Sequence, residues 1–190
     1  YISPGGTEAN IQAIWMYRNF FMYQKEAKID EIAILASEDT HYSIPKGANI
    51  LMLDWLKIPV SFESREIDKL ALENEIIKAK QNGKKYFIAI ANLATTMFGS
   101  VDNPDDFTTI LEKHEVEYKL HIDGAYGGFV YPFSNQKSKI NFSNPKISSI
   151  TIDAHKMLQS PYGTGIFICR KGLIDNVLTK EAEYIEGMDL

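Results

Sequence analysis

Short apolar runs alternate with longer amphipathic segments along this chain, and that alternation restricts its fold more than any other feature. Residues 32–36 and 86–91 are almost wholly apolar, as expected of strands that are buried on both faces. Residues 7–25 instead repeat their apolar side chains with the period of an α-helix. Strands that alternate with helices predict a three-layer α/β protein with a mostly parallel sheet.

The expected elements can be placed by residue number. Helices are expected over residues 7–25, 42–51, 67–81 and 105–114. Strands are expected over residues 32–36, 57–62, 86–91, 118–123, 149–153 and 165–169. Asn103, just before Pro104, is the expected cap of the fourth helix. A short connection leads to the last strand, which we expect to be the one antiparallel strand. Residues 134–146 are expected to form a polar loop.

Composition and charge exclude several classes of protein. The 190 residues are 45% hydrophobic and 24% charged, which suits a soluble domain with one core. The net charge of −5 and the lack of a basic run argue against nucleic-acid binding. No apolar stretch approaches the roughly 20 residues that a membrane-spanning helix needs. The single cysteine, Cys169, cannot form an internal disulfide, which fits a reducing cytoplasm.

The first expected helix carries an aromatic and methionine cluster. Residues 15–17 and 20–22 are all Trp, Met, Tyr or Phe. A helix that is apolar nearly all round is expected to be buried on two sides. The cluster therefore indicates core or interface, and an interface would suit a dimer.

Several polar segments are expected to meet at one edge of the sheet. Asp123 and the pair His155 and Lys156 lie at or just after the carboxyl ends of strands, as do residues 37–41 and 92–96. Ligands of parallel α/β sheets bind outside these ends. Together with residues 5–10, these segments predict a ligand site built from five separate parts of the chain.

Residues 5–10, Gly-Gly-Thr-Glu-Ala-Asn, open the first expected helix. Glycines allow a close approach of the backbone to an anion, the helix start offers free N–H groups, and Thr7 adds a hydroxyl. The plainer alternative is a turn in which Thr7 or Ser3 caps the helix. The segment lacks the glycine spacings of dinucleotide and nucleoside-triphosphate sites, so it favours a simpler phosphate group.

Asp123 follows apolar Ile122 and precedes small residues that leave room for a flat ring. A carboxylate in such a place needs a cationic partner, and a protonated pyridine nitrogen would serve. A structural aspartate or a metal ligand paired with His121 is the alternative. No third ligand has suitable spacing, so we expect no metal site.

Further side chains are candidates for the same site. Lys156 can supply an amine to a carbonyl cofactor, although a lone lysine usually faces solvent. The imidazole of His41 can stack on a cofactor ring and move protons, or can pack locally. The pair Thr95 and Thr96 can place a hydroxyl near the cofactor's phenolic oxygen, or can belong to a turn.

Taken together, these segments resemble the fold-type-I pyridoxal-5′-phosphate enzymes, and most closely the group II amino-acid decarboxylases. That family includes the aromatic-L-amino-acid, glutamate and tyrosine decarboxylases. Residues 5–10 are similar to its phosphate-binding turn, residues 121–126 to its His-Val-Asp-Ala-Ala-Tyr segment, and residues 149–156 to the stretch that ends in His-Lys. The resemblance extends over nearly the whole chain, and the motifs occur in the same order.

The resemblance implies a role for each matching residue. Lys156 becomes the Schiff-base lysine, Asp123 the partner of the pyridine nitrogen, and His41 the ring-stacking histidine. These three are the expected catalytic residues. The expected cofactor contacts are Gly6, Thr7, His41, Thr96, Asp123, Ala125, Ser149, His155 and Lys156.

Two residues depart from the family pattern. Ala154 stands where Pro or Gly is frequent, and Asp153 stands where Asn is common. An ionised aspartate would repel a phosphate, so we expect Asp153 to bond to His155 or Thr7. The Asp-x-His-Lys form also resembles sphingosine-phosphate lyase, which leaves the bond that is broken open.

The implied function is that of a lyase in amino-acid, and hence carboxylic-acid, metabolism. It would decarboxylate an L-amino acid to its amine and CO2 through the Lys156 Schiff base. A carbon–carbon lyase and an aminotransferase of the same fold are the enzymatic alternatives, and an inactive folded fragment is the non-enzymatic one. The resemblance further implies a cytoplasmic homodimer. Residues 1–190 would be an incomplete large domain, without the N-terminal segment and the C-terminal small domain.

Overall fold

The structure of the protein is a computed structural model that describes residues 1–135 and 138–177. The strands are β1 (Ile2–Ser3), β2 (Ile32–Ser37), β3 (Asp54–Ile58), β4 (Tyr86–Asn92), β5 (Glu117–Asp123), β6 (Ile147–Asp153) and β7 (Gly165–Cys169). The α-helices are α1 (Gly6–Gln24), α2 (Ser43–Ile50), α3 (Lys69–Gln81), α4 (Pro104–Lys113) and the short α5 (Tyr131–Ser134). Single 3-10 turns cover Ile29–Glu31 and Ile174–Asn176.

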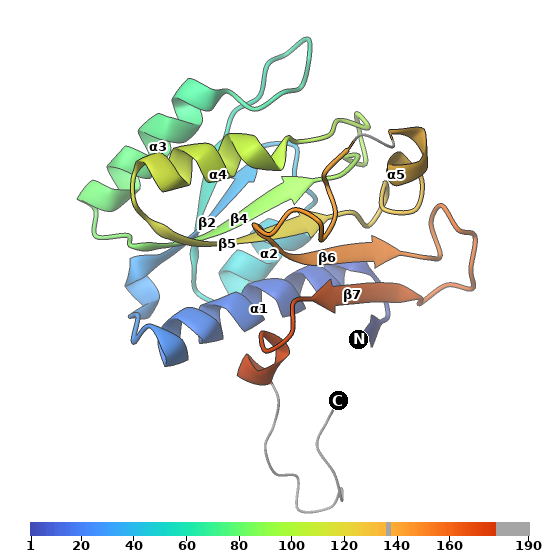
Figure 1. Cartoon of the computed structure of the whole chain (residues 1–190), viewed down its shortest axis with the longest axis horizontal. Helices are drawn as coiled ribbons and strands as arrows, with labels where there is room; N and C mark the ends of the chain where they lie inside the picture. The colour runs from blue at the N-terminus through green and yellow to red at the C-terminus, as the bar shows by residue number, and fades with distance from the viewer. Residues whose placement is uncertain (136–137, 178–190) are drawn as a thin grey trace, which may run out of the picture.

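The described strands form one sheet of seven strands in the order β1-β7-β6-β5-β4-β2-β3. Strands β2 to β6 are mutually parallel. β7 pairs antiparallel with both β6 and β1 and so runs against the rest. Helices α1 and α2 cover one face, and α3 and α4 cover the other (Figure 1). The predicted three-layer α/β fold with one antiparallel strand is confirmed.

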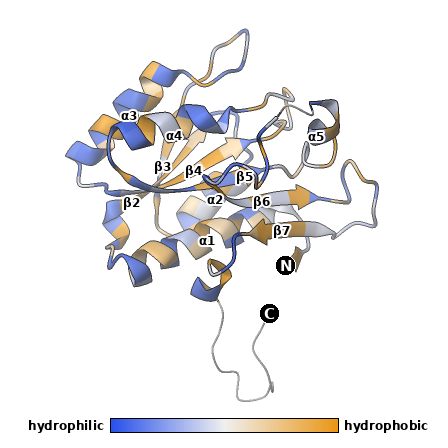
Figure 2. Ribbon diagram, viewed as in Figure 1, coloured by the Kyte–Doolittle hydropathy of each residue, from blue (hydrophilic) through white to orange (hydrophobic). Residues whose placement is uncertain are grey.

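Two apolar cores explain why the central strands are apolar throughout. Along β2, Ile32, Ile34 and Ala36 pack toward α1 and α2, whereas Ala33 and Leu35 pack toward α3. Figure 2 shows the central strands as the most hydrophobic part of the chain, between helices that carry hydrophilic residues on their outer sides. A strand with both faces covered needs apolar side chains at every position. None of the helices in the described part is long and apolar enough to cross a membrane.

The aromatic and methionine cluster of α1 packs inside the chain itself. Met16, Tyr17 and Phe21 are fully buried in the core below the sheet, and Trp15 and Phe20 pack against that core. The chain's own sheet and α2 therefore account for the burial on two sides. The cluster consequently gives no support to a dimer.

The strand expected over residues 57–62 is wrong in position. β3 is Asp54–Ile58, and it pairs with β2 from Ala33 to Ser37. Pro59 follows, and a proline has no N–H to continue the ladder. The chain then turns back, with the N–H of Ser61 donating to the carbonyl of Glu66 at 2.8 Å. The apolar residues beyond Ile58 belong to this turn, and Phe62 is 87% exposed.

The other elements lie within a few residues of their expected positions. The Asn103 cap is confirmed, because its side-chain oxygen accepts from the N–H of Asp105 at 3.2 Å. Two elements have no counterpart in the expectations, namely β1 and α5. Of the polar loop expected over 134–146, residues 136 and 137 lie outside the described part.

Asp102 forms hydrogen bonds to the carboxyl end of β4. It is 3% exposed, and its Oδ2 accepts from both the backbone N–H (2.8 Å) and the side-chain amide (2.7 Å) of Asn92. Asn92 in turn donates to Ser37 at 3.1 Å and accepts from Thr40 at 3.1 Å. Asn92 therefore links the ends of β2 and β4, and Asp102 fixes Asn92 in this position, next to the place where the site residues are expected.

Burial raises the pKa of Asp102 from 3.8 to about 6. Between these pH values the folded chain keeps a proton that the unfolded chain has lost, so the stability that Asp102 contributes falls as the pH rises. We predict that Asp102→Asn removes this loss. The free energy of unfolding of the variant, relative to wild type, should increase by up to about 3 kcal/mol between about pH 4 and pH 7.

Urea unfolding at several pH values measures this difference. Asp105→Asn is the matched control, because Asp105 lies close by in α4 but is exposed. It should not reproduce the trend. Parallel pH profiles for wild type and Asp102→Asn would show that the Asp102 carboxyl does not resist ionisation.

Candidate functional site

The N-terminus of α1 presents unpaired backbone N–H groups. The carbonyl of Gly5 accepts from Glu8 and Ala9, at 3.1 and 3.2 Å. No side chain caps the helix. The N–H groups of Gly6 and Thr7 have no acceptor within the described part of the chain. A helix start of this kind attracts an anion, because its N–H groups and its dipole both favour negative charge.

Gly6 brings this helix start against the ends of β5 and β6. A Cβ on Gly6 would lie 2.8 Å from the Cβ of Ala125 and 2.9 Å from Oδ2 of Asp153. On the other side, a Cβ on Gly165 in β7 would lie 2.7 Å from the Cα of Gly5. Both glycines therefore allow backbone approaches that any side chain would block.

Lys156 lies in the turn after β6. Its Nζ is 3.1 Å from Oδ2 of Asp153, and the same oxygen is 3.7 Å from Nε2 of His155. The Asp153 side chain is 2% exposed, whereas the Lys156 side chain is 31% exposed. The structure thus places Asp153 beside His155, as expected, but not beside Thr7. The ion pair with Lys156 was not part of the expectation.

The carboxylate of Asp123 is buried at the end of β5. Its Oδ1 accepts from the N–H of Ala125 at 3.2 Å, and its Oδ2 accepts from the amide of Asn10 at 2.8 Å. Burial raises the pKa of Asp123, and both hydrogen bonds and the nearby charges of His41 and Lys156 oppose that rise. A buried carboxylate of this kind is suited to a cationic partner.

His41 precedes α2 and is half-buried. Its Nδ1 lies 2.9 Å from the hydroxyl of Ser43, and its ring is 4.1 Å from the ring of Tyr42, centroid to centroid. Burial lowers the pKa of His41, which favours the neutral imidazole. The ring lines the same cavities as Lys156 and Ala125.

These side chains meet around two adjoining cavities. A cleft of about 820 Å³ is lined by the start of α1 and by Asp153, His155 and Lys156. A slot of about 20 Å³ is lined by Asp123 and Thr96, among others. The residues that line both are His41, Ala125 and Lys156. Since the slot holds about one water molecule, a ring-sized ligand requires the cleft.

The structure brings all but one of the expected contacts to these cavities. Ser149 is the exception, because it is fully buried between α1 and the sheet. Its hydroxyl bonds to Tyr17 and lies 2.6 Å from Nδ1 of His121. We correct its expected role to that of a buried hydrogen-bonding residue. Thr96 is exposed at the slot, while its neighbour Thr95 is buried and bonds to Ser100 at 2.7 Å.

Pyridoxal phosphate fits these residues. The free N–H groups of α1 suit its phosphate, the Asp123 carboxylate suits its ring nitrogen, and the Lys156 amine suits its aldehyde. Two buried polar atoms beside the cleft, Oδ1 of Asp153 and Nδ1 of His155, have no hydrogen-bond partner among residues 1–135 and 138–177. Unsatisfied buried atoms of this kind are expected where a ligand completes a site. Within the described residues, no three His, Cys, Asp or Glu side chains could jointly hold a metal ion.

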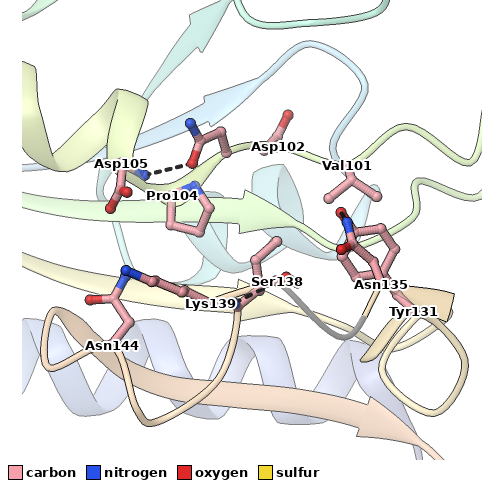
Figure 3. Close-up of a pocket in the computed structure, with 11 residues that line it drawn as sticks. Val101, Asp102, Pro104, Asp105, Tyr131, Asn135, Ser138, Lys139 and Asn144 are labelled. Carbon is pink, nitrogen blue, oxygen red and sulfur yellow. Dashed lines mark hydrogen bonds between the residues drawn. The ribbon is translucent and has the colours of Figure 1, made fainter. Parts of the chain in front are cut away.

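A second groove lies apart from this chemistry. It has a volume of about 430 Å³ and is lined by residues of α4 and of the segment around Lys139 (Figure 3). Asp102, Asp105 and Tyr131 are among its lining residues. None of the expected site residues lines this groove, so it is not a candidate for the cofactor site.

Sequence reasoning missed several residues of the site. Asn10 belongs to the Gly-Gly-Thr-Glu-Ala-Asn motif, but the motif does not predict its hydrogen bond to Asp123. Tyr42 and Tyr162 line the cleft, and Tyr162 is 93% exposed beside His155. No spacing in the sequence indicates the contact between Asn10 and Asp123, because it joins segments that are distant along the chain.

Comparison with known proteins agrees with this geometry. The sequence model of the family described as "Pyridoxal-dependent decarboxylase conserved domain" matches residues 1–189. The chain is 57% identical to the tryptophan decarboxylase of Clostridium sporogenes, over all of this chain and 46% of that protein. It is 35% identical to the histidine decarboxylase of Vibrio anguillarum, again over all of this chain and 46% of that protein.

A solved structure with a similar fold is the sphingosine-1-phosphate lyase of Burkholderia pseudomallei. The TM-score is 0.82 and the identity is 19%, with 100% of this chain and 42% of that chain covered. At this identity the likeness concerns the fold alone. The chain spans about half the length of the curated relatives that it matches. From the match over residues 1–189, this chain belongs to the family of pyridoxal-dependent decarboxylases.

Proposed function

We propose that this chain is part of the large domain of an enzyme that uses pyridoxal 5′-phosphate to decarboxylate an L-amino acid to its amine and CO2. The observation that carries the proposal is the convergence of a free helix start, a buried carboxylate and a lysine around two adjoining cavities, with Lys156 lining both. The family match supports decarboxylation over transamination or another carbon–carbon cleavage.

When bound, pyridoxal phosphate supplies an aldehyde that reacts with amines and a ring that accepts electrons. Lys156 is the proposed covalent anchor of the cofactor, since its amine lies at the junction of the two cavities. Asp123 holds a proton on the ring nitrogen, because its buried carboxylate is stabilised by a positive charge. Gly6, Thr7 and His155 hold the phosphate, and Thr96 and Ala125 bound the space for the ring.

Protons at the site are handled by His41 and Lys156. The Lys156 amine rests against Asp153 at 3.1 Å, which keeps it positioned over the cleft. His41 lines both cavities, and its neutral imidazole, which burial favours, can take up a proton and pass it on during the reaction. Either group can return a proton to the substrate carbon after CO2 leaves.

Further proposals concern the intact protein. We propose that an N-terminal segment and a C-terminal small domain complete the large domain formed by residues 1–190, and that two copies form a homodimer. The proposal rests on the family match and on the half-length coverage of the relatives. We also propose a cytoplasmic location, for which the support is the single cysteine.

An aromatic amino acid is the proposed substrate class, with tryptophan as the first compound to test. The support is the 57% identity to a protein named tryptophan decarboxylase. A histidine decarboxylase is a more distant relative at 35% identity. Histidine is therefore the second compound to test.

Lys156 should be the residue that retains the cofactor covalently. We predict that borohydride reduction of the intact protein with pyridoxal phosphate attaches the cofactor to the peptide that contains Lys156, as located by mass spectrometry. Lys156→Arg keeps the positive charge beside Asp153 but cannot form the bond, so it should lose the label. Its turnover should fall at least about 100-fold, the scale of a lost proton-transfer group.

Lys171→Ala is the control for Lys156, because Lys171 lies exposed in the turn after β7 and lines neither cavity. It should keep the label and the turnover. Labelling of another lysine in the wild type, with Lys156 unmodified, would refute the assignment.

The products should identify the reaction. We predict that the intact protein with pyridoxal phosphate converts tryptophan to tryptamine with one CO2 released for each amine, as followed by chromatography and gas measurement. Formation of the oxo acid in place of the amine would indicate transamination. An aldehyde formed by cleavage of a side-chain bond would indicate the other type of carbon–carbon lyase.

A further inference from the structure

Asn10 lies at the centre of a buried hydrogen-bond network behind the site. Its side chain is on α1 and is 1% exposed. The amide nitrogen donates to Oδ2 of Asp123 at 2.8 Å and to the hydroxyl of Ser43 at 2.9 Å. The amide oxygen lies 3.0 Å from Nε2 of His121. One side chain thus joins α1 to β5 and to the start of α2.

The direction of each hydrogen bond follows from Asp123. An ionised carboxylate only accepts, so the Asn10 group facing it is the NH2 and the group facing His121 is the oxygen. His121 therefore donates from Nε2. Burial lowers the pKa of His121 to about 3, so its ring is neutral and its Nδ1 accepts from the hydroxyl of Ser149. The Ser149 oxygen is then left to accept from Tyr17.

In this series of hydrogen bonds, every donor points toward Asp123. The order runs from the Tyr17 hydroxyl through Ser149, His121 and Asn10 to the carboxylate. Bonds that point the same way polarise one another and strengthen the last one. The arrangement favours the anionic form of Asp123, which its burial alone would disfavour.

A branch of the same network reaches His41. The Ser43 hydroxyl oxygen accepts from Asn10, so its hydrogen is free to point to Nδ1 of His41 at 2.9 Å. The backbone N–H of Ser43 also points to that nitrogen, at 3.3 Å. With Nδ1 engaged as an acceptor, the neutral ring of His41 carries its proton on Nε2.

We propose that Asn10 is the positioning residue of the site, since its buried amide orients the Asp123 carboxylate and, together with the backbone N–H of Ser43, favours the Nε2–H tautomer of His41. The first half rests on the proposed function, because it concerns the partner of the cofactor ring. The second half concerns this chain alone. In this role Asn10, which also lines the cleft, acts through Asp123 and His41.

A second buried asparagine on the same helix shows what a purely structural role involves. Asn19 is 4% exposed, donates to the backbone carbonyl of Asn176 at 2.9 Å and accepts from Arg18. It lies nine residues further along α1, about 13 Å away along the helix axis. Asn19→Ala is therefore the matched control for a variant at Asn10.

The test uses the intact protein and two variants of Asn10. Asn10→Asp is nearly isosteric and keeps an acceptor for His121, but it loses both donated hydrogen bonds. Asn10→Ala loses all three. Nitrogen-15 NMR of the histidine side chains reports the tautomers of His41 and His121, and absorbance titration reports the dissociation constant for pyridoxal phosphate. The 15N signal of labelled cofactor reports the protonation of its ring nitrogen.

In the wild type we expect Nε2–H tautomers at both His41 and His121. Both Asn10 variants should shift His41 toward a mixture of tautomers and lower the protonation of the ring nitrogen. Both should weaken cofactor binding about 10- to 100-fold, the range for one hydrogen bond to a charged group. Asn19→Ala should leave all three readouts at wild-type values, even if it lowers the melting temperature.

Two results would overturn the proposal. One is a wild-type His41 that carries its proton on Nδ1, which needs no variant to observe. The other is a folded Asn10→Asp protein with wild-type His41 signals and wild-type ring-nitrogen protonation. If the wild type binds no pyridoxal phosphate, the proposed function fails instead, and the His41 tautomer still tests the part played by Asn10.

Discussion

The burial of one carboxylate organises the site of this protein. Asp123 sits at the end of a central strand, where an uncompensated charge would destabilise the fold. Hydrogen bonds from α1 and from the following turn stabilise it from behind and leave its open side toward the slot. The close packing of α1 on the sheet therefore also stabilises the buried charge of Asp123.

The same packing positions the N-terminus of α1. α1 starts at Gly6, whose lack of a side chain lets the helix meet Ala125 and Asp153. A helix held this close directs its free N–H groups into the cleft that Lys156 borders. The helix start, the Asp123 carboxylate and Lys156 are thus positioned by one helix and the ends of two neighbouring strands.

Asp153 adds a second buried carboxylate to the site. It stands between Lys156 and His155, with one oxygen paired and the other without a partner in the part of the chain that the structure describes. A carboxylate so close to the proposed phosphate position is balanced by the two basic groups that flank it. Ser149, by contrast, is buried behind the site and is linked to it by hydrogen bonds through His121 and Asn10.

Much of this protein is determined by its sequence alone. The apolar runs determine which strands are buried. The glycines and the polar residues at the strand ends form the motifs, and the order of these motifs identifies the family. All of these are local patterns of the sequence. The two-residue β1, the true position of β3, the slot beside Thr96 and the network around Asn10 depend on tertiary structure. Each of them joins residues that are far apart in sequence, and no local pattern records which side chains the packing of α1 on the sheet brings together.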